Sequence, residues 1–132
     1  IALAVDADGI HLGQEDMPTK MARKLLGSEK IIGRSTHSLE DIKKAEEEGC
    51  DYIGIGSIFP SETKKKLNTI GIDNLSKGLN KTLLPAFAIG GINSSNIKKL
   101  NQINNLRIAV SDAIINSSDP LKNTKELFKF LS

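Results

Sequence analysis

Short apolar runs alternate with amphipathic stretches along the chain, and polar loops separate the two. The apolar runs are solid rather than alternating in polarity. Solid apolar runs that alternate with helical segments are typical of a parallel sheet covered by helices. We therefore predict an α/β protein in which strand, loop and helix repeat about five times, with strands at residues 9–12, 30–35, 52–59, 84–89 and 106–110.

Capping residues predict where the first two helices begin and end. Asp16 can cap a helix whose first turn holds Pro18 and whose end falls at Gly27. Ser38 can cap the next helix, with Asp41 three residues on as a capping box. Residues 1–5 read as the end of a helix. Further helices are predicted at 73–79, from 94 or 95 to 100, and from 120 onward, the last with Leu121, Leu127, Phe128 and Leu131 on its apolar side.

Two architectures fit this pattern, a doubly wound open sheet and a (β/α)₈ TIM barrel. Both place ligands after the strands, where glycine, serine and charged residues gather here. Gly90-Gly91 and the strand end at 109–111 favour the barrel, which commonly binds phosphate after its last two strands. A complete barrel needs roughly 200 residues or more. We therefore expect residues 1–132 to form one partial barrel domain that supplies about the last five βα units, with three units before Ile1.

The composition limits which kinds of partner the protein is expected to bind. Apolar residues make up 39% of the chain and charged residues 26%, which is ordinary for a globular domain. The net charge of +2 arises from 18 basic and 16 acidic residues, so it does not favour nucleic acid, and any anion site must be local. The single cysteine, Cys50, fits a reducing cytoplasm. No apolar run approaches the roughly 20 residues of a membrane span. We expect a cytoplasmic protein without nucleic-acid or membrane partners. Whether it forms a homo-oligomer is left open by the sequence.

The segment after the third apolar run carries candidate chemistry. Pro60 cannot donate to a sheet ladder, so the strand should end there. Ser61, Thr63 and Lys64 then place two hydroxyls and an ammonium just past the strand end. Short donors beside a positive charge suit a phosphate ester or a diphosphate. The alternative is a polar loop followed by a solvated basic run at residues 64–66.

Five segments together resemble the thiamine-phosphate synthase family, in order and in spacing, from one end of the chain to the other. They are Gly-Ile-His-Leu-Gly-Gln-Glu-Asp at 9–16, Gly-Arg-Ser-Thr-His at 33–37, Ser-Ile-Phe-Pro-Ser-Glu-Thr-Lys at 57–64, Ala-Ile-Gly-Gly-Ile at 88–92 and Val-Ser-Asp-Ala-Ile at 110–114. Any one of these segments alone would be a weak signal. The resemblance implies a TIM-barrel transferase.

The resemblance also implies the reaction. The family joins 4-amino-2-methyl-5-(diphosphooxymethyl)pyrimidine to 4-methyl-5-(2-phosphooxyethyl)thiazole, with Mg²⁺, and forms thiamine phosphate and diphosphate. The implied mechanism is dissociative: diphosphate leaves, a pyrimidinylmethyl cation forms, and the thiazole nitrogen attacks it. Such a reaction needs a metal and cations to neutralise the leaving diphosphate. It needs no nucleophile–base pair, and the sequence shows no candidate for one.

The resemblance assigns roles at the first three strand ends. Asp16 matches one of two Mg²⁺-binding aspartates, and a hard oxygen ligand suits Mg²⁺. Ser35 and Lys64 match catalytic residues beside the diphosphate, while Ser61 and Thr63 match contacts to the thiazole phosphate. The second aspartate, and a glutamine and lysine that hold the diphosphate, belong to earlier strands. We therefore expect the 132 residues alone to be inactive.

Further matches lie at the last two strand ends. Gly91 matches a backbone donor to the thiazole phosphate, where a side chain would block the approach. Val110 and Ser111 match a segment whose amides bind the same phosphate. Ala109 and Asp112 stand where the family usually has serine.

Two other functions compete with the synthase. The first is a thiazole tautomerase of the same superfamily, in which His37 would be the acid–base catalyst. The second is a non-catalytic phosphate-binding fragment. For His11 we favour a structural role, as an inward or interstrand histidine.

Overall fold

A computed structural model of the chain describes residues 1–60, 69–104 and 106–130. Within these residues, five strands pair in parallel, each with the next strand along the chain. The strand order contains no reversal, so the sheet lacks the switch point of a doubly wound fold. The strands are β1 (Gly9–Leu12), β2 (Ile31–Thr36), β3 (Tyr52–Ile55), β4 (Ala86–Ile89) and β5 (Arg107–Ala109).

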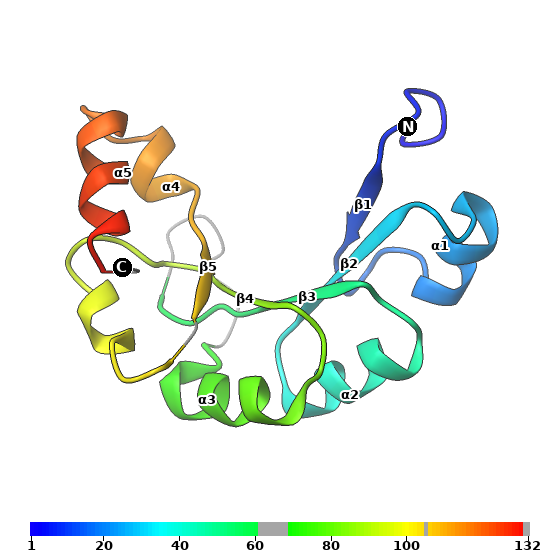
Figure 1. Ribbon diagram of the computed structural model, residues 1–132, viewed down its shortest axis with the longest axis horizontal. Helices are drawn as coiled ribbons and strands as arrows, with labels where there is room; N and C mark the ends of the chain where they lie inside the picture. The colour runs from blue at the N-terminus through cyan, green and yellow to red at the C-terminus, as the bar shows by residue number, and fades with distance from the viewer. Residues whose placement is uncertain (61–68, 105, 131–132) are drawn as a thin grey trace.

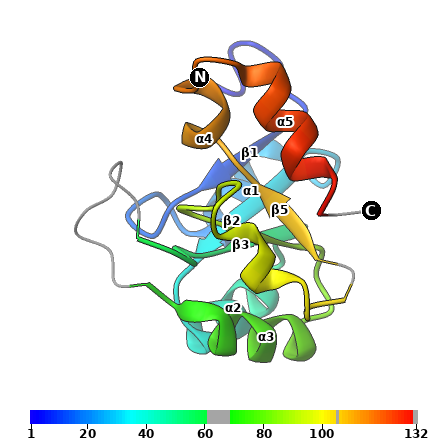
Figure 2. The same cartoon turned by 90° about the vertical axis from the view of Figure 1, so that its left-hand side faces the viewer.

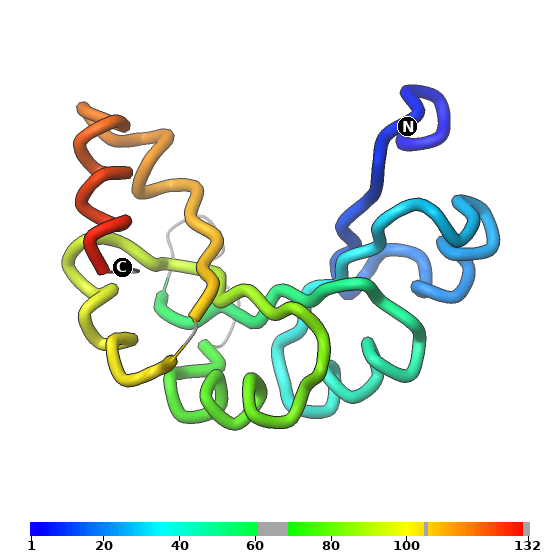
Figure 3. The backbone as a smooth tube through the Cα atoms, viewed as in Figure 1, coloured from blue at the N-terminus to red at the C-terminus, as the bar shows by residue number. Residues whose placement is uncertain are grey.

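Helices follow the strands and lie on the outside of a curved sheet (Figure 1). Figure 3 shows the backbone as an open arc whose two ends lie on opposite arms. Figure 2, turned by 90°, shows α4 and α5 stacked beyond β5. The helices are α1 (Thr19–Leu26), α2 (Leu39–Glu47), α3 (Gly71–Lys81), the 3₁₀ helix η2 (Ile97–Leu100), α4 (Asp112–Ile115) and α5 (Pro120–Phe128). None of the helices in the described part of the chain is long and apolar enough to cross a membrane.

The two faces of the sheet differ sharply in burial. On the convex, helix-covered face, Ile32 and Ile53 are fully buried. On the concave face, Ile31 is 50% exposed and Ile89 is 43% exposed. A doubly wound sheet would have helices on both faces, whereas the described helices cover only one. The structure therefore confirms the α/β class and the five repeats. The curved sheet with helices on one face is that of a partial TIM barrel and not of a doubly wound fold.

Two predictions near the N-terminus are wrong. Residues 1–5 form a turn rather than the end of a helix; Val5 donates to the Ile1 carbonyl, and the turn closes at Asp6, whose φ is +49°. Asp16 does not cap α1, which begins after Pro18 without a side-chain cap. The Asp16 carboxylate instead accepts a hydrogen bond from the Gly13 amide. By contrast, Ser38 caps α2 as predicted, by accepting from the Asp41 amide.

Element ends also differ from the predictions. β3 stops at Ile55, four residues early, although the Ile58 and Phe59 amides still donate to carbonyls at the end of β4. The helix expected from 94 or 95 is only η2, because Asn93 and Asn96 make a side-chain turn before it. α3 is longer than predicted. On α5, Leu127 is buried as expected, whereas Leu121 and Phe128 are about two-thirds exposed and Leu131 lies outside the described residues.

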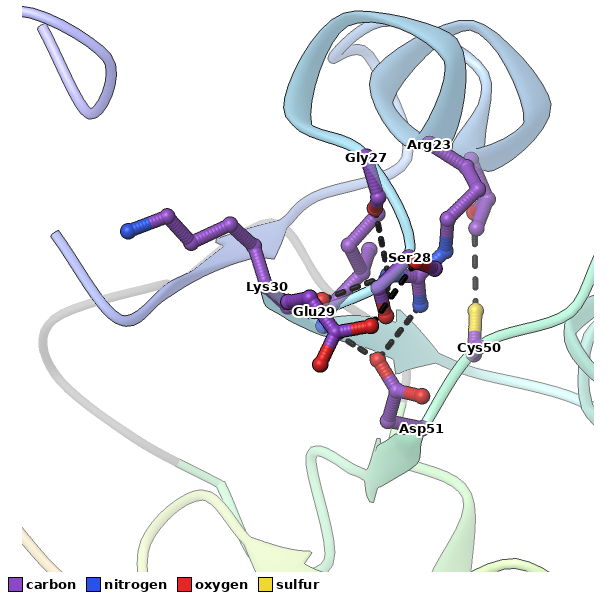
Figure 4. A network of polar contacts seen from close by, with 9 residues as sticks. Arg23, Gly27, Ser28, Glu29, Lys30, Cys50 and Asp51 are labelled. Carbon is purple, nitrogen blue, oxygen red and sulfur yellow. Dashed lines mark hydrogen bonds and ion pairs between the residues drawn. The ribbon is translucent and has the colours of Figure 1, made fainter. Parts of the chain in front are cut away.

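A polar network centred on Asp51 ties the amino-terminal ends of the strands together (Figure 4). One oxygen of Asp51 accepts from the Ile32 amide and from the Arg23 guanidinium, both at 2.6 Å. The same guanidinium donates to the carbonyls of Gly27 and Lys30. Burial opposes ionisation of Asp51, but these hydrogen bonds outweigh it and hold its pKa below the usual 3.8. The network lies at the edge of the sheet that in barrels serves stability.

We predict that Asp51→Ala destabilises the complete protein by about 1–3 kcal/mol, because the Ile32 amide loses its acceptor. Urea unfolding measures the effect. The matched control is Glu47→Ala, whose exposed carboxylate makes only a 3.7 Å surface pair with Lys43 and should matter by less than about 1 kcal/mol. Since the pKa of Asp51 is lowered by folding, its contribution is present at neutral pH and is lost as the pH falls below 3.8. Equal stability of wild type and Asp51→Ala at pH 7 would contradict this account.

Candidate active site

The predicted site residues that the structure describes all lie at or just beyond the carboxyl edge of the sheet. Asp16 follows β1, Ser35 lies near the end of β2, and Gly91 follows β4. Val110 and Ser111 follow β5. Parallel strands place all their carboxyl ends on one side, so residues far apart in sequence share this edge. Ser61, Thr63 and Lys64 lie outside the described residues.

The loop between β1 and α1 holds Asp16 in a compact turn. The Gly13 amide donates to Asp16 Oδ2 at 2.6 Å, and the Asp16 amide donates to the Gly13 carbonyl at 3.2 Å. The buried Arg34 guanidinium donates to the Met17 carbonyl at 3.1 Å. The Gln14 side chain donates to the Ser35 carbonyl. These contacts fix the loop against β2 and bring Asp16 and Ser35 to the same region.

On the concave face, His11, Ser35 and Tyr52 form a connected hydrogen-bonded line. His11 Nε2 lies 2.9 Å from Ser35 Oγ, and His11 Nδ1 lies 3.0 Å from the Tyr52 hydroxyl. The structural role expected for His11 is therefore confirmed, since it links its strand to the next two. The histidine and the serine lie within hydrogen-bond reach although they are 24 positions apart in sequence.

Glycines make this line possible. His11 and Tyr52 both stand opposite Gly33 in the strand register, one on each side of β2. A Cβ at Gly33 would overlap the Tyr52 ring, so the missing side chain lets the phenol reach His11 across β2. Tyr52 also meets Phe87 edge-on, with ring centroids 5.8 Å apart. Burial raises the pKa of Tyr52 and keeps its hydroxyl protonated. Tyr52 was not predicted as a site residue, because its place opposite Gly33 depends on the strand register and leaves no signal in the sequence.

His37 lies just past β2, and its side chain contacts the backbone at the end of β3. Its Nδ1 contacts the Gly56 carbonyl, and its amide donates to Asp41 Oδ2 at 2.8 Å. The side chain thus joins the end of β2 to the end of β3. Its place at the carboxyl edge is compatible with the predicted acid–base role, and its Nδ1 contact also serves the local fold.

At the far end of the edge, Gly91 is constrained by its own chain. Its φ is +68°, and a Cβ there would lie 2.5 Å from the Pro60 carbonyl oxygen and 2.7 Å from that of Phe59. The packing of the loop after β3 against the end of β4 is therefore enough to require glycine at position 91. The Gly91 carbonyl accepts from Asn93 and from Asn96, at 3.3 and 2.8 Å.

A cavity of about 270 Å³ lies beside this end of the sheet. Asp112, which stands where the family usually has serine, lines it, and its carboxylate accepts from Asn116 Nδ2 at 2.6 Å. None of the predicted substrate-binding residues in the described part of the chain lines this cavity. Its lining is Asn93, Ser94, Asp112, Ala113, Asn116, Ser117, Asn123 and Leu127.

The donor set at Asp16 fits a magnesium ion that is shared with a substrate. No cluster of three or more histidine, cysteine, aspartate or glutamate residues that could hold a metal occurs among the described residues. Mg²⁺ is usually bound through one or two carboxylates together with substrate phosphates and water, rather than in an all-protein cage. Asp16 is exposed and sits on a fixed loop, so its carboxylate suits that mode.

The fold and the site together define a class: a TIM-barrel-type α/β protein whose polar side chains gather at the carboxyl edge of a parallel sheet, where such barrels hold their ligands. Comparison with known proteins identifies the family. The sequence profile described as Thiamine monophosphate synthase matches residues 1–114. The chain belongs to this family.

Individual relatives agree with that assignment. A thiamine-phosphate synthase of Prochlorococcus marinus is 56% identical over 127 residues, which are 96% of this chain and 37% of the relative. One from Clostridium tetani is 43% identical over 132 residues, covering all of this chain and 63% of the relative. The solved thiamine phosphate pyrophosphorylase of Pyrococcus furiosus superposes with a TM-score of 0.86 at 42% identity, over 98% of this chain and 62% of that one. The chain thus spans between about one third and two thirds of the length of these relatives.

We predict that Gly91→Ala destabilises the complete protein more than Gly49→Ala. Both glycines have positive φ, +68° and +78°, so both substitutions incur about 1–2 kcal/mol of backbone strain. Only Gly91 also meets backbone carbonyls; Gly49 has no atom within 4 Å of its added Cβ. Overpacking should add about 1–3 kcal/mol at Gly91. Thermal unfolding of the two variants measures the difference, and equal losses would refute the packing role of Gly91.

Proposed function

We propose that the protein of which this chain is part is a thiamine-phosphate synthase. It condenses 4-amino-2-methyl-5-(diphosphooxymethyl)pyrimidine with 4-methyl-5-(2-phosphooxyethyl)thiazole to give thiamine phosphate and diphosphate. Family membership and relatives with that name at 42–56% identity support the activity. A cytoplasmic location, small-molecule partners only and a possible homo-oligomer belong to the same proposal.

One structural observation carries the proposal furthest: the loop that holds Asp16 is hydrogen-bonded to the strand end that holds Ser35. Gln14 makes that link through the Ser35 carbonyl, and Arg34 fixes the same loop through the Met17 carbonyl. A carboxylate and a hydroxyl donor are therefore held together at one corner of the carboxyl edge. That corner suits a diphosphate shared between a metal and protein donors.

In the proposed reaction, the protein's task is to stabilise the negative charge that develops on the leaving diphosphate. Ser35 donates a hydrogen bond to it, and Lys64 supplies a positive charge. Ser61, Thr63, Gly91, Val110 and Ser111 hold the thiazole phosphate, which fixes the attacking ring nitrogen close to the reacting carbon. Asp16 would hold Mg²⁺, which neutralises diphosphate charge when bound.

The uncovered concave face of the sheet fits a protein in which further βα units complete the barrel. Ile31 and Ile89 on this face are 50% and 43% exposed, although both are large apolar residues. The relatives are longer than this chain. We propose that about three units outside these residues cover this face, and that they contribute the second aspartate and further diphosphate contacts. A non-catalytic fragment would result if those units were missing.

We predict that Asp16→Asn in the complete protein lowers kcat for thiamine phosphate formation by about 100-fold or more, because charge stabilisation by the metal amounts to several kcal/mol. The matched control is Glu15→Gln, an exposed carboxylate on the same loop, with activity expected within about twofold of wild type. Turnover of a thiazole carboxylate phosphate is assayed in parallel. If Asp16→Asn retains full activity in the synthase assay, the metal role is wrong; if it loses nothing while tautomerisation is the only turnover, the His37 tautomerase replaces the synthase.

We also predict that Lys64→Ala lowers kcat by about 10²–10³-fold, the usual effect of removing one donor to a developing anion. Lys66→Ala is the matched control, because it removes the same charge two residues away and should change kcat by less than about threefold. Steady-state assays with each substrate varied separate kcat from KM. Unchanged turnover in Lys64→Ala would remove this lysine from the diphosphate site.

A further inference from the structure

The line from Tyr52 through His11 to Ser35 is more than a structural link, because it ends at the one described hydroxyl that the proposed function places beside the leaving group. Tyr52 lies 3.0 Å from His11 Nδ1, and Ser35 lies 2.9 Å from His11 Nε2. Both nitrogens of one imidazole are thus engaged by hydroxyls. A neutral imidazole has one donor and one acceptor nitrogen. His11 therefore accepts a hydrogen bond from one of the two hydroxyls and donates one to the other.

The fold prepares this line rather than leaving it to side-chain mobility. His11 and Tyr52 flank Gly33 in register across β2, and only glycine there leaves room for the Tyr52 ring. Ser35 stands opposite Gly54, whose added Cβ would lie 3.6 Å from His11 Cε1. Two glycines on neighbouring strands therefore leave the space that the imidazole and the phenol occupy.

The direction of the hydrogen bonds follows from the relative strength of the groups. A phenol is a stronger donor than a neutral imidazole N–H, and its raised pKa keeps the proton on Tyr52. The Tyr52 hydroxyl lies 3.0 Å from His11 Nδ1, so we infer that the phenol donates to this nitrogen. When Tyr52 donates to Nδ1, the imidazole proton is on Nε2 and is donated to Ser35 Oγ. The serine hydrogen is then free to point at a ligand.

We propose that Tyr52 and His11 are positioning residues that orient the Ser35 hydroxyl as a hydrogen-bond donor to the leaving diphosphate. This inference rests on the proposed function, because it takes the diphosphate as the acceptor. Neither residue touches the substrate in this role. The opposite arrangement, in which His11 accepts from Ser35, would point the serine lone pairs at an anion and would work against diphosphate departure.

A double-mutant cycle on the complete protein tests the coupling. Ser35→Ala and His11→Ala should each lower kcat by about 10-fold or more, with KM for both substrates changed by less than about threefold. The double variant should be no slower than Ser35→Ala alone, since His11 acts only through that hydroxyl. Fully additive losses would overturn the proposal.

The control cycle pairs Ser35→Ala with Ile31→Ala. Ile31 lies on the same strand and the same concave face, four residues before Ser35. Any loss from Ile31→Ala should add to that of Ser35→Ala, because the two side chains share no hydrogen bond. Non-additivity here as large as that in the His11 cycle would show that the assay reports general damage to the sheet, and the proposal would fall.

Conservative variants separate orientation from packing. His11→Gln keeps an N–H donor that can reach Ser35 and should recover kcat to within about fivefold of wild type. Tyr52→Phe removes only the hydroxyl and should lower kcat by about 3- to 10-fold without changing the melting temperature by more than a few degrees. A His11→Gln enzyme as slow as His11→Ala would count against the donor role.

A measurement independent of turnover keeps this inference separate from the proposed function. Nitrogen-15 NMR of histidine-labelled complete protein at neutral pH reports which imidazole nitrogen carries the proton, with His11 assigned by its loss in His11→Gln. We expect a protonated Nε2 and an unprotonated Nδ1 whose shift moves in Tyr52→Phe. A proton on Nδ1 overturns the orientation whether or not the protein is active. A protein with the expected tautomer but without thiamine phosphate formation overturns only the synthase, and with it the diphosphate as acceptor.

Discussion

Parallel strand pairing is the constraint on which the rest of this structure depends. Because every strand runs the same way, the residues that follow β1, β2, β4 and β5 share one edge of the sheet although they are up to about a hundred positions apart in sequence. The opposite edge is fixed by the Asp51 network, which ties α1, β2 and β3 through one carboxylate and one guanidinium. One edge thus supplies stability and the other carries the polar residues of the site.

The curvature of the sheet gives its two faces different tasks. The convex face carries isoleucines that pack beneath the helices. Part of the concave face carries glycines and polar residues: Gly33 stands opposite His11 and Tyr52, and Gly54 stands opposite Ser35. Glycine weakens a strand in general, but here it opens the space in which three longer side chains meet. The sheet is therefore expected to be less stable locally where His11, Ser35 and Tyr52 meet.

Much of the fold could be predicted from the sequence, because solid apolar runs mark buried parallel strands wherever they occur. The ends of elements were harder to predict. The pattern predicts that β3 runs through Ile58 and Phe59, because both are β-formers. Their amides instead pair with the carbonyls of Ile89 and Gly90, at and just past the end of β4. Asp16 looked like a helix cap, but the neighbouring Gly13 amide was the nearer donor. Such local competition is not visible in a pattern of apolar positions.

The site shows the same division. The family resemblance located Asp16, Ser35, Gly91, Val110 and Ser111, which the structure places along one edge. The resemblance gave no role to Tyr52 and only a structural one to His11, because their partnership arises from strand register across Gly33 rather than from adjacency in sequence.

The central claim is that this edge belongs to an enzyme that makes thiamine phosphate. The most direct measurement is to incubate the purified complete protein and Mg²⁺ with the pyrimidine diphosphate and the thiazole phosphate, and to quantify both products over time. The account predicts thiamine phosphate and diphosphate in equal amounts, with no product when either substrate is omitted. A folded protein that forms neither product from the two substrates would contradict it.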